Sequence, residues 1–273
     1  MHSGNASRPS PIGPHRADEI RSGDPYELSN GYLVECMPTG QRGGRSSVAG
    51  TLVLDTDPAV ESSGIDTGFS PHPAMLRAPD LSIGNVEDKP GWGRTVPPLA
   101  VEYADTGQDE VELQKKIVEF LAEGTQFLWV VRLTGPRRVE VYEPGTAMRV
   151  VWPGEVLKAP GILRNEVPVE VLYDREKAHR ATLRNLLQRE GYDSVEAVKA
   201  AGRDEGLKTG FKTGRDEGRL VEARSALRRV LARRELTLDA ADEARIEACI
   251  DLATLERWHD EAVVASSAAD ALR

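Results

Sequence analysis

The chain has 273 residues and a mass of 29.8 kDa, with 44 acidic and 35 basic residues, a net charge of −9 and a pI near 5.2. An acidic chain argues against wholesale coating of nucleic acid, which needs a basic face, although a local basic patch is still allowed. The two cysteines, Cys36 and Cys249, lie far apart, which excludes a disulfide framework and a Cys-rich zinc site. There is no apolar stretch of membrane-helix length and no secretory signal, so we expect a cytoplasmic protein without a membrane partner.

Composition divides the chain into three parts. Residues 1–17 are rich in Pro, Ser and Gly and are predicted to form a disordered leader. Residues 18–174 contain short apolar runs punctuated by Gly and Pro, which predicts a strand-rich domain. Residues 175–273 contain no proline and 19 residues of each charge, which predicts an α-helical tail and a candidate coiled-coil or oligomerisation region.

The predicted elements of the first domain begin with a hairpin over Tyr26–Cys36, because Asn30-Gly31 between apolar runs is the strongest short hairpin signal. Further strands are predicted over Met75–Ile83, Leu99–Tyr103, Phe127–Leu133, Arg138–Glu143 and, at an edge, Met148–Trp152. A helix is predicted over Asp109–Glu123, with acids in its first turn and Gly124 after it. A strand, a helix of this length and a strand imply a parallel crossover, so the expected fold class is α/β with a mixed central sheet and flanking helices.

Two regions carry weaker signals. Gly40–Gly44 lacks the Lys-Ser/Thr of a phosphate-binding loop and is predicted to be flexible, and the region from Gly43 to Ser70 is poorly periodic. In the tail we expect helices over residues 176–190, 194–236 and 239–266.

The middle of the tail carries a glycine at every fourth position from Gly202 to Gly218, which forms one drifting stripe on a helix. Glycines weaken a helix, so either packing against a partner or partial disorder should follow. The arginines from Arg219 to Arg234 make the only basic run. They either contact nucleic-acid phosphates or pair with acids of a partner helix, and the neutral charge of the tail favours the pairing.

Three residues of the first domain suggest a catalytic site. Asp80 follows a proline in one predicted strand, Glu102 lies inside the next apolar strand, and Lys116 lies on the following helix. A carboxylate inside an apolar run is costly to bury unless it is paired or binds a cation. Two acids on adjacent strands facing a lysine suit a hard divalent cation such as Mg²⁺ and an anionic substrate.

Helical geometry selects Lys116 over its neighbour. With Ile117 at 0°, the apolar residues of this helix lie within about 60°, Lys116 lies near −100° at the edge of the buried stripe, and Lys115 lies near 160° on the solvent side. Lys116 is therefore the better candidate to face the two acids.

At these residues the sequence resembles the Uma-type restriction endonuclease family of the PD-(D/E)XK nuclease superfamily. The similarity is carried by YELSNGYLVEC, RAPDLSIG, PPLAVEY, KIVEFLAEG and FLWVVRLTGPRRVEVYEPG, and it runs from about Asp18 to Tyr173. It implies a restriction-endonuclease-like fold in which Asp80 and Glu102 are metal ligands and Lys116 is the catalytic lysine. Glu27 matches an early family glutamate and is expected to be an accessory acid.

The chain departs from the superfamily pattern in two places. The Glu-x-Lys tripeptide is absent, because Tyr103-Ala104 follows Glu102, and the lysine displaced onto the helix takes its place. The long amphipathic helix usual before the Pro-Asp pair is not visible in the sequence.

The expected function is that of a Mg²⁺-dependent endonuclease, with Mn²⁺ as a substitute, that hydrolyses phosphodiester bonds in DNA. It is expected to act as a homo-oligomer assembled through the helical tail. The alternative is a catalytically inactive nuclease fold that serves as an oligomeric interaction or nucleic-acid-binding scaffold.

Overall fold

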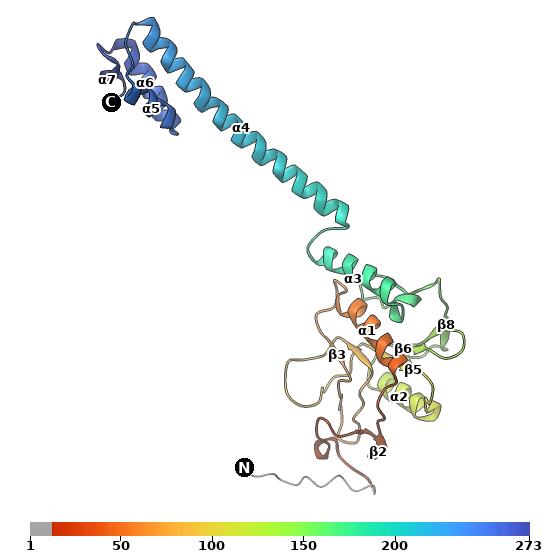
Figure 1. The fold of residues 1–273 in the computed structure, drawn as a ribbon. Helices are drawn as coiled ribbons and strands as arrows, with labels where there is room; N and C mark the ends of the chain where they lie inside the picture. The colour runs from red at the N-terminus through yellow and green to blue at the C-terminus, as the bar shows by residue number, and fades with distance from the viewer. Residues whose placement is uncertain (1–12) are drawn as a thin grey trace. The chain divides into compact units, whose positions relative to one another are not determined.

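The structure is a computed structural model that describes residues 13–273. The chain forms two compact units that divide after Ser194 (Figure 1). The strands are β1 (Tyr26–Ser29), β2 (Tyr32–Glu35), β3 (Ser63–Ile65), β4 (Leu81–Ile83), β5 (Leu99–Ala104), β6 (Phe127–Arg132), β7 (Arg138–Tyr142), β8 (Arg149–Val151), β9 (Val156–Leu157) and β10 (Val167–Pro168). The helices are η1 (Ala17–Glu19), α1 (Gln41–Asp55), α2 (Glu110–Ala122), η2 (Val169–Leu172), α3 (Arg175–Arg189), α4 (Val195–Arg233), α5 (Ala240–Ala248), α6 (Leu252–Val264) and α7 (Ala268–Ala271).

The first unit is built on a six-stranded sheet in the order β3-β4-β5-β6-β7-β8. Only β5 and β6 run parallel, and α2 makes the crossover between them. The other neighbours in this sheet are antiparallel. The predicted α/β class with a mixed central sheet, flanking helices and a helical tail is confirmed.

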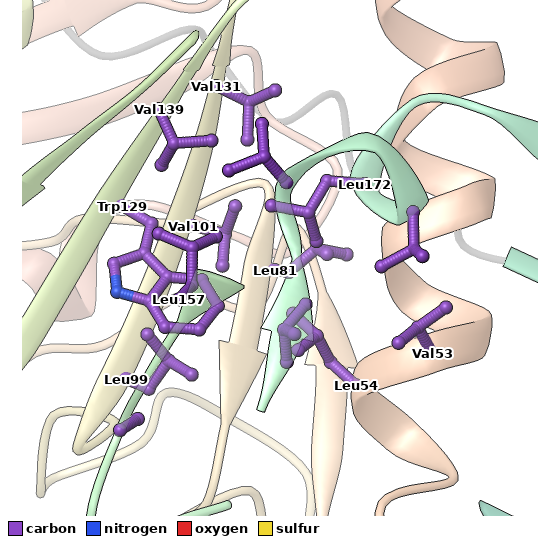
Figure 2. Packing of buried hydrophobic residues seen from close by; sticks show 14 of the residues in the cluster. Val53, Leu54, Leu81, Leu99, Val101, Trp129, Val131, Val139, Leu157 and Leu172 are labelled. Atoms are coloured by element: carbon purple, nitrogen blue, oxygen red, sulfur yellow. The ribbon is translucent and has the colours of Figure 1, made fainter. Parts of the chain in front are cut away.

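Side chains of the central strands alternate between two buried layers. Trp129 and Val131 of β6 face the layer that contains Val53 and Leu54 of α1 (Figure 2). Leu128 and Val130 face the opposite layer, where Leu113, Ile117 and Phe120 of α2 are packed. The period of two along each strand therefore places α1 and α2 on opposite faces of the sheet.

The hairpin forms as predicted. Asn30 and Gly31 have φ values of 50° and 84°, as a two-residue turn between right-twisted strands requires. Leu28 also exchanges backbone hydrogen bonds with Leu76, which fastens the hairpin to the segment before β4.

The glycine-rich segment predicted to be flexible is instead the start of α1, which corrects that expectation. An added Cβ at Gly50 would lie 2.0 Å from the Tyr103 hydroxyl, so only glycine allows α1 to lie this close to β5. Glycine and serine fill much of the helix surface, and their weak hydrophobic pattern concealed the helix in the sequence.

Two further boundaries differ from prediction. The first compact unit extends to Ser194 and not to Asp174, because α3 packs on α1 and the Asn185 side chain donates to the Val53 carbonyl at 2.9 Å. The predicted leader falls on residues 1–12, which lie outside the described residues, and on residues 13–17. His15 and Ala17 in this second stretch are buried, and the His15 amide donates to Gly31.

The second unit consists of the long helix α4 and a small helical bundle formed at its C-terminal end. Its core contains Leu227 and Leu231 of α4 together with Ile246, Leu255 and Trp258. The last predicted helix is broken between α5 and α6, where the Asp251 side chain accepts a hydrogen bond from the Thr254 amide and starts a new helix.

Arg224, Arg228 and Arg229 of the arginine run pair with acids of their own chain, and pairing with acids of a partner helix stays a prediction. Arg228 contacts Glu243 and Glu247, both on α5, at 2.9 Å each. The expected self-association of the tail stays a prediction. Among residues 13–273, no helix has both the length and the apolar character to cross a membrane.

Candidate active site

Sheet register brings Asp80 and Glu102 together. In the antiparallel β4–β5 pair, Leu81 is opposite Val101, so the residue before β4, Asp80, comes opposite Glu102. Directly opposite residues project from the same face of a sheet, with Cβ atoms about 5 Å apart. An Asp80 carboxylate oxygen accepts a hydrogen bond of 2.6 Å from the Tyr103 amide, which holds the aspartate against β5.

The face that carries these acids is the one covered by α2. Within β5, Ala100 and Ala104 belong to the α2 layer, and Glu102 lies between them in the same alternation. Their small side chains let α2 approach the strand on either side of the glutamate. The helix begins at the Asp109 side chain, which accepts hydrogen bonds from the Val111 and Glu112 amides.

Lys116 of α2 reaches from the edge of the buried stripe to this pair of strands. Its ammonium nitrogen lies 2.8 Å from Glu102 Oε1, 2.9 Å from Glu27 Oε1 and 2.6 Å from the Ala78 carbonyl oxygen. An ammonium has three N–H donors, so these three acceptors match its capacity. Lys115 points to solvent and pairs with Glu112, so the choice of Lys116 from helical geometry agrees with the structure.

Glu27 comes from the hairpin and completes the surroundings of the lysine. Besides Lys116, its carboxylate accepts hydrogen bonds from Arg77 Nη1 at 3.0 Å and from the Ala78 amide at 3.3 Å. The structure therefore brings together all four residues singled out in the sequence: Glu27, Asp80, Glu102 and Lys116.

Burial and charge shift the acids in different directions. Burial raises the pKa of Glu102 to about 8, reinforced by the Asp80 charge and opposed by Lys116. Burial also raises the pKa of Asp80. At Glu27 burial works in the same direction, but the charges of Lys116 and Arg77 outweigh it and hold the pKa below its usual value. Two acids that resist ionisation without a further cation are thus placed beside one that is already stably charged.

The donor set fits a hard cation. Asp80 and Glu102 offer carboxylate oxygens from facing positions, and Mg²⁺ is usually held by one or two carboxylates with waters and phosphate oxygens. Glu102 Oε1 is buried and, despite its ion pair with Lys116, has no well-oriented hydrogen-bond donor among the described residues. No group of three or more His, Cys, Asp or Glu side chains in residues 13–273 has a metal-binding arrangement, so any ion would complete its shell with water, backbone or substrate oxygens.

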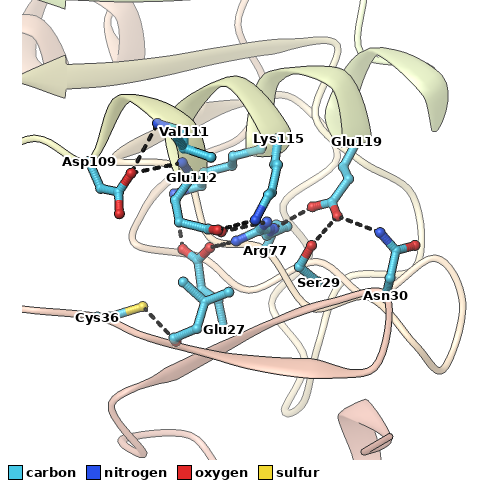
Figure 3. A network of polar contacts seen from close by, with 12 residues as sticks. Glu27, Ser29, Asn30, Cys36, Arg77, Asp109, Val111, Glu112, Lys115 and Glu119 are labelled. Carbon is cyan, nitrogen blue, oxygen red and sulfur yellow. Dashed lines mark hydrogen bonds and ion pairs between the residues drawn. The ribbon is translucent and has the colours of Figure 1, made fainter. Parts of the chain in front are cut away.

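Sequence reasoning did not single out Arg77, which lies three residues before Asp80. Arg77 is 1% exposed and contacts Glu27, Glu112 and Glu119 (Figure 3). The signal was present: Glu112 and Glu119 lie four residues before and three after Lys116, hence on the same face of α2. The other sequence signal was Arg77 itself, a charged residue placed between the apolar Leu76 and the Pro79-Asp80 pair.

Comparison with known proteins identifies the family of the chain. The Uma2 family, described as “Putative restriction endonuclease”, matches residues 15–170, more than half of the chain. A search of curated proteins found no match. Among solved structures, the chain is similar to “a putative nuclease belonging to DUF820 from Anabaena variabilis ATCC 29413”, with 18% identity, a TM-score of 0.49, and coverage of 59% of this chain and 99% of that one. Since the family match spans the hairpin, the sheet and all four site residues, the chain belongs to the Uma2 family of nucleases.

Proposed function

We propose that this protein is a Mg²⁺-dependent endonuclease that hydrolyses phosphodiester bonds in DNA. The observation that carries the proposal is the placement of two facing carboxylates, Asp80 and Glu102, beside one largely buried lysine, Lys116, which forms an ion pair with Glu102. A bound divalent cation would lower the pKa of a coordinated water and offset negative charge developing on the phosphate.

The chain's own residues have distinct parts in this proposal. Asp80 and Glu102 supply the oxygen ligands, and the Tyr103 amide fixes the orientation of the aspartate. Lys116 supplies a positive charge and N–H donors for the attacking water or the developing charge on phosphate. Its three donors already face three acceptors, so it can contact substrate only by giving up one of them.

Glu102 is the acceptor that Lys116 can release most readily. Glu102 is the proposed metal ligand, and a cation bound to its carboxylate would draw negative charge from it and weaken its attraction for the lysine. Glu27 and the Ala78 carbonyl are not proposed metal ligands, so they stay available to the ammonium. We therefore assign Glu27 the part of an anchor that keeps Lys116 beside the reacting phosphate.

Phosphodiester substrates suit this site because it combines a cation-binding pair with an ammonium, and both favour phosphate oxygens. DNA as the polymer rests on the family's description as restriction endonuclease. The net charge of −9 predicts weak DNA affinity without the divalent cation.

Plasmid cleavage with Mg²⁺ or Mn²⁺ tests the proposal. The wild type should nick or linearise the plasmid, while Asp80→Asn, Glu102→Gln and Lys116→Met should each lose about a hundredfold or more in rate. Lys115→Met is the matched control: it removes the neighbouring lysine from the exposed side of the same helix and should keep wild-type activity. Equal cleavage by all five proteins, or none by the wild type with either metal, would overturn the assignment.

A further inference from the structure

Arg77 is buried among three carboxylates, of Glu27, Glu112 and Glu119, none of which is a proposed metal ligand. Its Nη1 donates to Glu27 Oε2 at 3.0 Å, and its Nε donates to Glu119 on α2. Its Nη2 has no hydrogen-bond partner among the described residues, and the nearest carboxylate oxygen, of Glu112, is 3.8 Å away. A buried guanidinium with an unused donor carries a desolvation cost, so its presence calls for a reason beyond packing.

One carboxylate joins Arg77 to Lys116. Glu27 directs its Oε2 to Arg77 and its Oε1 to Lys116, so each oxygen serves a different cation. The Ala78 amide also donates to Oε1. Arg77 therefore holds one oxygen of Glu27 and, with it, helps to set the position of the carboxylate that contacts Lys116.

Arg77 is itself held from two elements. Glu119 accepts from Arg77 and from the Ser29 hydroxyl, and Asn30 of the hairpin turn donates to the same glutamate at 3.4 Å (Figure 3). The arginine thus ties the hairpin, which carries Glu27, to α2, which carries Lys116. A planar guanidinium can serve two carboxylates at fixed angles, whereas an ammonium is a single charge point.

We propose that Arg77 is a positioning residue that fixes Glu27 so that Glu27 keeps Lys116 at the scissile phosphate once Glu102 is engaged elsewhere. This proposal rests on the proposed nuclease function. It assigns no contact between Arg77 and substrate. It predicts that losing Arg77 affects turnover through Glu27, and that substrate binding is much less affected.

A kinetic double-mutant cycle tests the route through Glu27. We expect Arg77→Met to lower kcat about a hundredfold with KM changed less than about threefold, since misplacing a catalytic group costs this much. Arg77→Lys should recover part of the loss. The double variant Arg77→Met/Glu27→Gln should be no slower than Glu27→Gln alone. If the fold-loss in kcat of the double variant equals the product of the two single losses, Arg77 does not act through Glu27.

A matched variant separates positioning from general stability. Arg132 is another buried arginine of the same unit, 9% exposed and paired with Glu110 and Glu140. Arg132→Met should lower the melting temperature by an amount similar to Arg77→Met but leave kcat within about twofold, because it does not contact Glu27 or Lys116. An equal loss of kcat in both variants would mean that Arg77 acts only through folding.

Amine acetylation followed by mass spectrometry tests the same link without activity. Lys115 serves as the internal reference, since it is exposed on the same helix. In the wild type Lys116 should be acetylated much more slowly than Lys115, and Arg77→Met should raise the Lys116-to-Lys115 ratio about tenfold, because one charged hydrogen bond is loosened. Arg132→Met should leave this ratio unchanged.

Nuclease kinetics and the acetylation ratio together distinguish failure of the proposed function from failure of the positioning role. A wild type without nuclease activity would defeat the proposed function, while the acetylation ratio would still report whether Arg77 holds Lys116. An active wild type with an unchanged ratio in Arg77→Met would defeat the positioning role alone.

Discussion

The glycines of α4 allow a quantitative prediction about helix stability. Gly206, Gly210 and Gly214 lie in its middle, and an added Cβ at each would meet nothing within 4 Å among the described residues beyond the backbone of its own helix and its chain neighbours. Alanine there gains the helix propensity that glycine lacks, about 0.8–1 kcal/mol per site. The triple variant should therefore stabilise this stretch of helix by about 2.5–3 kcal/mol.

Hydrogen exchange of the full chain measures this gain. A local stabilisation of this size lowers the opening constant of residues 203–218 about a hundredfold, and their amides should exchange more slowly by that factor. Gly124→Ala is the control with the opposite sign. Its added Cβ also meets open space among the described residues, but its φ of +110° is unfavourable for alanine, so this variant should lose stability. Unchanged or faster exchange in the triple variant, with a fall in mass by light scattering, would show that the glycines contact a helix of a second copy.

Three further predictions concern the first unit. Replacing Asn185 by alanine removes the shorter of two hydrogen bonds to the Val53 carbonyl and should cost about 1–3 kcal/mol in a urea titration. A loss near zero would mean that water or the Thr56 hydroxyl replaces the amide. Phe120→Ala should cost about 3–5 kcal/mol by the same titration, because this fully buried ring leaves a cavity under α2, and a smaller loss would indicate that the helix collapses into it. Burial opposes ionisation of Glu140, but its hydrogen bonds to Arg132 and Arg138 outweigh this and lower its pKa in the folded state. Its ionised form therefore stabilises the protein above the unfolded pKa of about 4.3, and this contribution is lost as pH falls through the lower folded value. The wild type should accordingly melt at a higher temperature than Glu140→Gln near neutral pH, and this difference should disappear in acid. A difference that persists below both the folded and the unfolded pKa of Glu140 would contradict stabilisation by its ion pairs.

Local signals accounted for the elements on which the site is built. The Asn30-Gly31 pair predicted the hairpin because few residues accept two successive positive φ values. The segment from β5 to β6 was predicted with its parallel crossover because the helix length and the two apolar runs leave little choice. Lys116 was chosen over Lys115 from helical angles, since the buried residues Leu113, Ile117 and Phe120 define one stripe along α2.

What escaped prediction depends on contacts between distant segments. Helix α1 lacks a strong apolar period because Gly50 is required by the nearby Tyr103 hydroxyl, a constraint invisible in local sequence. The role of Arg77 depends on Glu27 and on Glu119, which lie 50 and 42 residues away in the chain. Sequence patterns reveal which residues are neighbours on one helix or strand. The buried ion network around Arg77 is formed by residues of three separate segments, so no such pattern reveals it.

Strand β5 places the candidate site in the most cooperative part of the molecule. Glu102 points to one face, while its neighbour Tyr103 points to the other and donates to the Leu172 carbonyl at 3.0 Å. All six residues of the strand are buried, and it has hydrogen-bonded neighbours on both sides. Local unfolding occurs mainly in weakly packed segments of a protein. The backbone at Glu102 should therefore open only when the whole unit unfolds. This backbone would hold Glu102, the proposed metal ligand, in place through ordinary fluctuations. Any motion in the proposed reaction would then fall to α2 and the hairpin, which bring Lys116 and Glu27 from outside the strand.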